Sequence, residues 1–302
     1  MAASIALLAL CFALGLWAQR RLPGDRLRAR AWTAYFWTVT PLLVFTAFTT
    51  IGLDAGLGLA IAAAILASWA VIGIGYAYAA SVTSERDERG ALALAAGFPN
   101  TGFLGYPLAQ LALGNPGLAL MVVYDRLAWL VPATAVSTTI ARLHGRRETP
   151  SARRRLRALL ANPPLYAAVA ALSLRAAGVD LAAAVEPAGD VAAAVVGPAG
   201  VFLLGLALPL EPARHEGPDL TRAAGALAIR FAVAPLALFL SGLALGAEIP
   251  AAFYLGAAMP CAFHLLVLAR VFDVRPHLMR LLVVGSTVPA VAVVVLASLA
   301  WP

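Results

Sequence analysis

The sequence predicts an all-α membrane protein whose ten transmembrane helices form two inverted repeats of five. Three observations lead to this fold class. Of the 302 residues, 62% are hydrophobic and only 12% are charged, and the apolar residues gather into ten long runs. Arginine is concentrated in alternate connections between these runs. Proline recurs at matching places in the two halves of the chain.

The ten apolar runs account for nearly the whole chain. The hydrocarbon core of a bilayer is about 30 Å thick and a helix rises about 1.5 Å per residue, so a run of about 18 residues is expected to cross it. The predicted spans are residues 3–19, 32–51, 57–80, 91–113, 117–141, 163–179, 190–210, 221–245, 250–270 and 277–301. We interpret the first as a retained helix and not as a signal peptide, because Arg20 and Arg21 follow the apolar run.

The distribution of arginine predicts the orientation of these spans. All 22 basic residues are arginines, and all but Arg126, Arg175 and Arg230 lie in or beside the odd-numbered connections. Cytoplasmic loops carry an excess of basic residues, so the odd connections are expected in the cytoplasm and both termini outside. The net charge of +7 therefore reflects topology. We interpret the basic cluster at residues 153–157 as a contact with anionic membrane lipid, and we expect no nucleic-acid partner.

Matching prolines divide the chain into two repeats. The pairs, in the same order in both halves, are Pro41 with Pro198, Pro99 with Pro260, and Pro132 with Pro289. Because each half has an odd number of spans, the second half must enter the membrane from the opposite side, which makes the repeat an inverted one. The predicted units are residues 1–142, a basic cytoplasmic linker at 143–158, and residues 159–302.

Two of the matching prolines interrupt the fourth and ninth spans. A proline inside a helix removes a backbone hydrogen bond and costs about 3 kcal/mol, and in lipid the freed groups must find other partners. Broken helices in corresponding positions of two repeats indicate the substrate site of a transporter, and their N-terminal ends favour an anion such as a carboxylate. The candidate substrate-binding residues are Pro99, Asn100, Thr101, Pro260, Cys261 and His264.

Asp125 is the only carboxylate deep within a predicted span. Ionisable groups there are costly and usually functional, so Asp125 is a candidate for proton or ion coupling. The alternative is a structural ion pair with Arg126 or Arg230. We expect a direct pair with Arg126 to be strained, because adjacent residues of a helix point about 100° apart. We expect Arg230 to extend toward the cytoplasmic surface, the alternative being that it attracts anions.

Residues 92–108, which include Gly97-Phe98-Pro99-Asn100-Thr101-Gly102, resemble the fourth-helix signature of the auxin efflux carrier family. That family includes plant PIN carriers and bacterial permeases for malate or malonate. Segments that resemble its sixth, eighth and ninth helices are residues 162–166, 228–235, 258–260 and 267–270. The resemblance implies a fold related to that of the bile-acid symporters and NhaA, with a scaffold domain and a transport domain.

The same resemblance implies an elevator-type movement of a small organic anion in a bacterial inner membrane, by a carrier that is often a homodimer. By motif match it assigns Pro99, Asn100 and Pro260 to the helix crossover. It leaves the substrate open. An auxin-like acid needs a wide apolar pocket, and a dicarboxylate such as malate or malonate needs a second cationic contact.

The remaining motifs argue against other functions. The sequence shows no nucleophile with a base partner, so we expect no enzyme; a lipid-modifying intramembrane enzyme is a remote alternative. Cys11 and Cys261 lie in separate apolar runs, and no metal or cofactor is expected. The residues beside Pro260 include no acid, which disfavours sodium coupling. A sodium- or proton-coupled symporter of a related anion is the alternative.

Overall fold

The computed structural model describes residues 2–21, 25–147, 161–207 and 220–300, and within these ranges the chain is helical without any named strand. Six helical stretches are long and apolar enough to cross a membrane. They are Ala3–Arg21, Ala29–Thr50, Ala55–Val82, Thr101–Trp129, Ala182–Ala207 and Leu220–Leu245. The predicted span 277–301 corresponds to α15 (Pro276–Ala300), which contains Pro289, and the remaining predicted spans correspond to shorter or interrupted helices. The arginine cluster at 153–157, and most of the predicted linker, lie outside the described residues.

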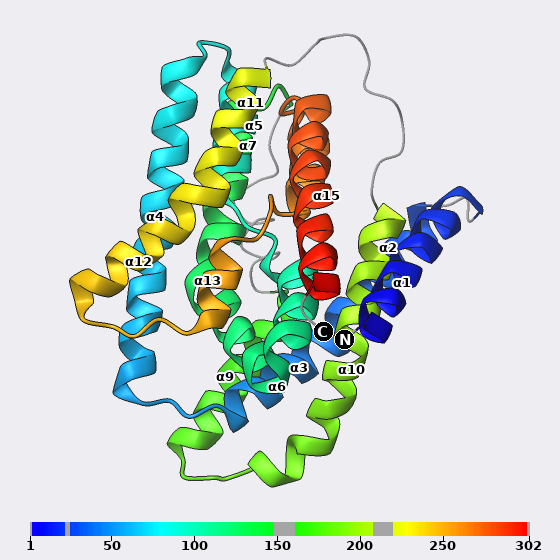
Figure 1. Cartoon of the computed structure of the whole chain (residues 1–302), viewed down its shortest axis with the longest axis vertical. Coiled ribbons are helices and arrows are strands. Elements are labelled where there is room, and N and C mark those ends of the chain that lie inside the picture. Colours follow the sequence, from blue (N-terminus) through cyan, green and yellow to red (C-terminus); the bar gives the residue numbers. More distant parts are fainter. Residues whose placement is uncertain (1, 22–24, 148–160, 208–219, 301–302) are drawn as a thin grey trace.

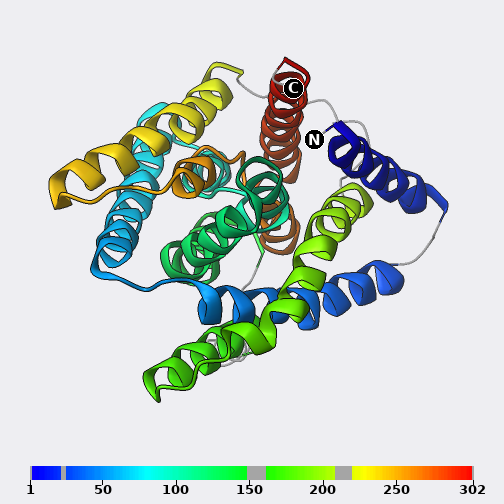
Figure 2. The same ribbon diagram turned by 60° about the horizontal axis from the view of Figure 1, so that its bottom comes forward.

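The helices form two packed groups (Figures 1 and 2). In the first group α1 packs on α10, α10 on α3, and α3 on α9. Its members are α1 (Ala2–Arg21), α2 (Asp25–Trp37), α3 (Val39–Thr50), α9 (Pro163–Ala176) and α10 (Ala182–Ala207). Figure 2 shows this group along the right and lower edges of the molecule.

In the second group α4 packs on α5 and α12, and α5 packs on α7, α11 and α15. Its members are α4 (Ala55–Val82), α5 (Arg86–Gly97), α7 (Ser137–His144), α11 (Leu220–Ala228), α12 (Ala234–Leu245), α13 (Ala251–Ala257), α14 (His264–Phe272) and α15 (Pro276–Ala300). Helix α6 (Tyr106–Tyr124) contacts α3 and α10 of the first group and α13 of the second.

Four short π-helical segments widen the turns of otherwise regular helices. They are η1 (Thr101–Gly105), η2 (Asp125–Trp129), η3 (Pro132–Val136) and η4 (Ile229–Val233). Single π turns inside helices occur frequently at functional sites. Here η1 and η2 lie at the ends of α6, and η4 joins α11 to α12.

The boundary between the predicted fourth and fifth spans is a kink. The helix from Thr101 to Trp129 is interrupted at Gly114, whose φ of 70° and ψ of −167° lie outside the helical region. Such a positive φ is readily adopted by glycine, which has no Cβ. Pro116 follows and begins the next helical stretch with a ring that is preset for a helix.

Glycine also brings α1 and α10 into close contact. A Cβ at Gly15 would lie 2.2 Å from the Phe202 carbonyl oxygen, and one at Gly205 would lie 2.3 Å from the Phe12 carbonyl oxygen. Small residues let membrane helices approach closely enough for van der Waals contact along the backbone. The two glycines therefore allow the crossing that joins α1 to the rest of the first group.

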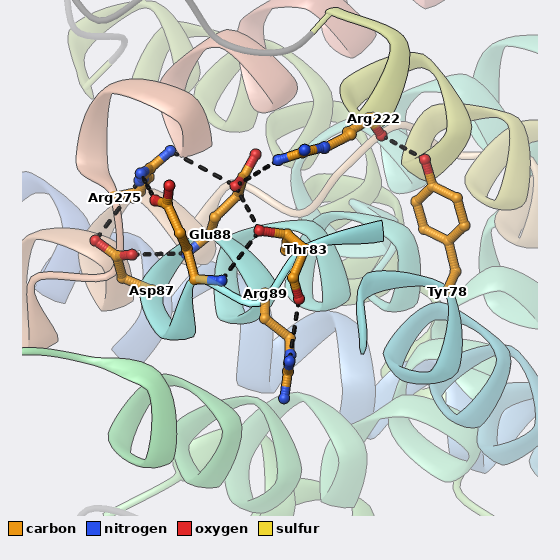
Figure 3. A network of polar contacts seen from close by, with 8 residues as sticks. Tyr78, Thr83, Asp87, Glu88, Arg89, Arg222 and Arg275 are labelled. Carbon is orange, nitrogen blue, oxygen red and sulfur yellow. Dashed lines mark hydrogen bonds and ion pairs between the residues drawn. The ribbon is translucent and has the colours of Figure 1, made fainter. Parts of the chain in front are cut away.

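Ion pairs connect α5, α11 and the turn before α15 at one end of the molecule (Figure 3). The Arg275 guanidinium lies beside Glu85, Asp87 and Glu88, with Nε 3.6 Å from Asp87 Oδ2. Arg222 Nη1 is 3.0 Å from Glu88 Oε2, and the Thr83 hydroxyl donates to the same oxygen at 2.7 Å. These contacts hold the third and ninth connections and the start of α11 together.

Candidate functional site

The two proline-interrupted segments lie against each other. Helix α5 ends at Gly97 and the chain becomes helical again at Thr101, whereas α13 ends at Ala257 and α14 begins at His264. Between them, the Asn100 N–H donates to the Pro260 carbonyl and the Ala262 N–H donates to the Phe98 carbonyl, both at 2.8 Å. An antiparallel bridge pairs Pro99 with Cys261. Each interruption therefore supplies backbone partners for the other.

A cavity of about 620 Å³ lies beside this crossover. Five of the residues expected at the site line it: Pro99, Asn100, Thr101, Asp125 and His264. Pro260 and Cys261 are not among the lining residues. Cys261 is fully buried; its thiol donates to the Ala95 carbonyl at 3.3 Å and its N–H donates to the Ser286 hydroxyl at 3.1 Å.

Both helix groups contribute to the cavity wall, and much of that wall is aromatic. The aromatic lining residues are Tyr35, Phe36, Phe98, Phe103, Tyr106, Trp129 and Phe263. Tyr35 and Phe36 come from α2, whereas Phe98 and Phe263 come from the crossover. Trp32 stacks at 6.0 Å on Phe263 and meets Phe103 edge to face at 4.5 Å, which fixes two of these rings. The cavity is therefore suited to a ligand with a flat or apolar body.

Asp125 is held by three partners at the cavity wall. It accepts hydrogen bonds from the Thr101 hydroxyl and, at 2.6 Å, from the Tyr106 hydroxyl. Its Oδ2 lies 2.8 Å from Arg126 Nη2, and both side chains are about nine-tenths buried, with exposures of 12% and 13%. Arg126 also donates to the Tyr106 hydroxyl at 3.1 Å.

Asp125 and Arg126 form the direct ion pair that was one of the alternatives for Asp125, although we expected such a pair to be strained. The chain winds as the π-helix η2 from Asp125 onward, so the angle of a regular α-helix does not apply there. The long arginine side chain also bends back over the Tyr106 hydroxyl, which contacts both charged groups. Tyr106 is thus a site residue that the sequence analysis missed, and Arg126, which it considered only as an ion-pair partner of Asp125, also lines the cavity. The sequence did contain hints of both residues: Tyr106 lies within the motif at residues 92–108, and Arg126 directly follows Asp125.

Three buried polar atoms of cavity-lining residues have no hydrogen-bond partner within the described part of the chain: Asn100 Nδ2, Trp129 Nε1 and His264 Nε2. The Asn100 side chain is oriented by its oxygen, which accepts from the Phe103 N–H at 3.3 Å and so caps the helix that begins at Thr101. Asn100 is only 2% exposed, and a buried donor without a partner costs free energy. Because an amide nitrogen only donates, the missing partner must be an acceptor.

Arg230 lies directly behind the crossover and is fully buried. Its Nη1 donates to the Gly97 carbonyl at 3.1 Å and its Nη2 to the Ala257 carbonyl at 2.7 Å. The expectation that it extends to the membrane surface was therefore wrong, because the ends of α5 and α13 offer carbonyl acceptors at its own depth. The position of Arg230 inside the predicted eighth span indicated that it is buried. Its hydrogen-bond partners could not be predicted, because they come from two segments that are distant in the sequence.

A comparison with models of protein families matches residues 32–297 to a family described as Membrane transport protein. The matched range includes both interrupted helices, the residues lining the cavity and Arg230. Among curated proteins, none matches the chain.

Proposed function

The chain belongs to this family of membrane transport proteins, the family of the auxin efflux carriers and PIN-like proteins, and on that premise we propose that it is a secondary transporter of a small organic anion. It is an integral membrane protein. We propose that its substrate binds in the cavity beside the crossover, and that it carries this substrate across the membrane without chemical change.

The Asn100 amide nitrogen carries this proposal, because it has no partner in the described part of the chain and is placed to donate to an acceptor atom of a ligand in the cavity. A carboxylate supplies such an acceptor. The helices that begin at Thr101 and His264 add positive dipole ends on the same side of the crossover. The side chains of Thr101 and His264 line the cavity, and the guanidinium of Arg126 adds a positive charge to its wall. Pro99, Pro260 and Cys261 hold the backbone that positions these groups.

The lining favours an aromatic or apolar monocarboxylate over a dicarboxylate. Arg126 is the one arginine among the described residues that line the cavity, and it is already paired with Asp125. A dicarboxylate such as malate or malonate would lack the second cationic contact that it needs. An auxin-like acid would place its ring against the aromatic wall, where burial of apolar surface contributes about 25 cal/mol per Å².

We further propose ten spans in two inverted repeats and an elevator-type mechanism. The two packed helix groups support this division, because the cavity lies between them. In this proposal the group with α1, α3, α9 and α10 is the scaffold, and the group with the crossover moves past it. We place the odd connections in the bacterial cytoplasm and both termini outside, and we propose that scaffolds of two copies pair in the inner membrane.

Asp125 is the proposed coupling residue, with proton-coupled symport as the alternative mechanism. A substrate carboxylate that binds Arg126 would compete with Asp125 for the guanidinium. Asp125 released from this pair would retain its hydrogen bonds from Thr101 and Tyr106, and would be able to take up a proton. Sodium coupling is the less favoured alternative.

Currents on a solid-supported membrane would test the proposal, with purified protein in sodium-free proteoliposomes. We expect a saturable current with indole-3-acetate or phenylacetate and a weaker one with malate, malonate or succinate. Asn100→Ala should reduce the current at least about tenfold, as expected for loss of a hydrogen bond to a charged group. The matched control is Asn115→Ala, because Asn115 bonds to Asp190 away from the cavity.

Other outcomes would change the proposal in defined ways. A current with malate alone would contradict the aromatic substrate class. A current that appears only when a pH gradient is imposed would favour the proton-coupled alternative. Equal loss of current in Asn100→Ala and Asn115→Ala would contradict the placement of the site.

A further inference from the structure

Arg230 is the largest fully buried side chain of the described chain, and the transport site itself does not use it. Its hydrogen bonds go to backbone carbonyl oxygens: Ala96 at 3.4 Å, Gly97 at 3.1 Å and Ala257 at 2.7 Å. Its guanidinium carbon lies 5.9 Å from the centre of the Trp129 ring. In the described part of the chain, no carboxylate lies within ion-pair distance of it.

The carbonyl groups that Arg230 binds are the C-terminal ends of two interrupted helices. Helix α5 ends at Gly97 and α13 ends at Ala257, and the last carbonyls of a helix lack partners within it. The planar guanidinium carries donors in a fixed fork, so one nitrogen faces each helix end. In transporters with broken helices, such carbonyl ends are the groups that coordinate a sodium ion. Here the positively charged guanidinium of Arg230 lies at these carbonyl ends, in the place that a sodium ion has in such transporters.

The charge of Arg230 balances the partial charges of the helix ends at the crossover. Each helix end carries roughly half an elementary charge, negative at the C-terminus and positive at the N-terminus. The ends at Gly97 and Ala257 together amount to about one negative charge, which the guanidinium of Arg230 cancels. The ends at Thr101 and His264 then leave about one positive charge on the cavity side. Asp125 and Arg126 add no net charge because they are paired.

We propose that Arg230 is the built-in counter-charge of the crossover, which makes the site selective for a single negative charge and removes the need for a bound inorganic cation. This inference rests on the proposed function, because it names the charge of the substrate and the absence of coupling to a metal cation such as sodium. Arg230 acts through the helix ends and does not touch the substrate, so it is a positioning residue. Wild-type transport is then the same in sodium, potassium and choline buffers.

Chemical rescue of Arg230→Ala tests this inference. We expect this variant to lose acid-driven current at least about tenfold, and added guanidinium chloride at about 10 to 50 mM to restore it by binding the vacated position. Urea at the same concentration has a similar planar shape and N–H donors on two of its three arms but no charge, and should not restore it. Arg175→Ala is the matched control, because Arg175 donates to the Phe48, Thr49 and Ile51 carbonyls at the end of α3, away from the cavity. Its current should not respond to guanidinium.

The inference would be overturned by equal rescue by urea, by full current in Arg230→Ala without any additive, or by sodium dependence of the wild-type current. If Arg230→Ala does not fold, Arg230→Lys and Arg230→Gln replace it. Lysine keeps the charge and should keep most of the current, whereas glutamine keeps donors without charge and should lose it. Equal currents in these two variants would also overturn the inference.

The melting temperature of Arg230→Ala tests the counter-charge role without relying on transport. Guanidinium should raise the melting temperature of Arg230→Ala more than urea does, and should not raise that of the wild type. If no acid drives a current in the wild type but this selective stabilisation is found, the proposed function fails while the counter-charge stands. If currents are found without selective stabilisation or rescue, the counter-charge fails while the proposed function stands.

Discussion

Asp125 and Arg126 form an ion pair, and under the proposed function a substrate carboxylate has to enter it. The Asp125→Asn change leaves a neutral side chain of nearly the same shape, so it frees the guanidinium for the substrate. We expect a lower KM, by about tenfold for a gain of about 1.4 kcal/mol, and a lower maximal current because release becomes slower. The concentration dependence of the transport current measures both quantities.

The control for this prediction is Asp190→Asn, which changes a carboxylate that bonds to Asn115 away from the cavity. It should leave KM unchanged. A KM that rises in Asp125→Asn would mean that the carboxylate assists substrate binding and does not compete with it.

His144, beyond the end of the predicted span 117–141, gives the fold a pH dependence at its polar end. Its Nδ1 contacts the Arg86 carbonyl at 2.7 Å and its Nε2 contacts the Tyr76 hydroxyl at 3.2 Å. Burial lowers the pKa of His144 below its ordinary value of 6.5, and the nearby Arg89 and Arg86 charges act in the same direction. The folded protein therefore binds fewer protons than the unfolded chain, so stability is present above pH 6.5 and decreases as the pH falls below it.

Melting temperatures at pH 7.5 and pH 5.5 test whether stability decreases on acidification, as predicted. We expect the wild type to lose more stability on acidification than His144→Gln, which cannot take up the proton. An equal decrease in both proteins would show that other groups dominate.

At the scale of elements, the crossing of α1 and α10 depends on glycine. A Cβ at Gly205 would lie 2.3 Å from a backbone oxygen of α1, which cannot move aside as a flexible side chain would. We expect Gly205→Ala to destabilise the protein by about 1 to 3 kcal/mol, as overpacking does. Thermal unfolding in detergent measures the effect.

Gly73→Ala in α4 is the matched control, because a Cβ there would meet no heavy atom within 4 Å. It exchanges glycine for a better helix former, and the melting temperature should stay the same or rise. A decrease of similar size in both variants would contradict the role of close contact between α1 and α10.

The sequence predicted the interruptions at Pro99 and Pro260 because proline acts locally on its own helix. It also brought Asn100, Thr101, Asp125 and His264 forward as polar residues in apolar runs, and the structure places them around one cavity. The role of Arg230 was not predictable in this way, since its acceptors come from α5 and α13, and their approach is a property of the tertiary fold. The winding at η2 was also missed, because a π turn leaves no clear pattern in the sequence.

At the scale of the whole molecule, the two helix groups differ in what they offer the cavity. The first group contributes Tyr35, Phe36 and Thr40, with Asn162 at the start of α9, whereas the second contributes the crossover with His264. The ion pairs of Arg275 and Arg222 with the α5 carboxylates lie within the second group, so they join its parts without linking it to the first. In the proposed elevator mechanism, such a division would let one group slide past the other while the polar site stays intact.

The backbone pairing between the two interruptions also sets an order for the synthesis of the protein. The Asn100 N–H and the Phe98 carbonyl find their partners at Pro260 and Ala262, which leave the ribosome far later. Until then the predicted fourth span would have a break in the membrane without its final backbone partners, a costly condition in lipid. The first half of the chain is therefore expected to reach its final structure only when the second half has been made, and to depend until then on whatever protein surrounds it at the site of insertion.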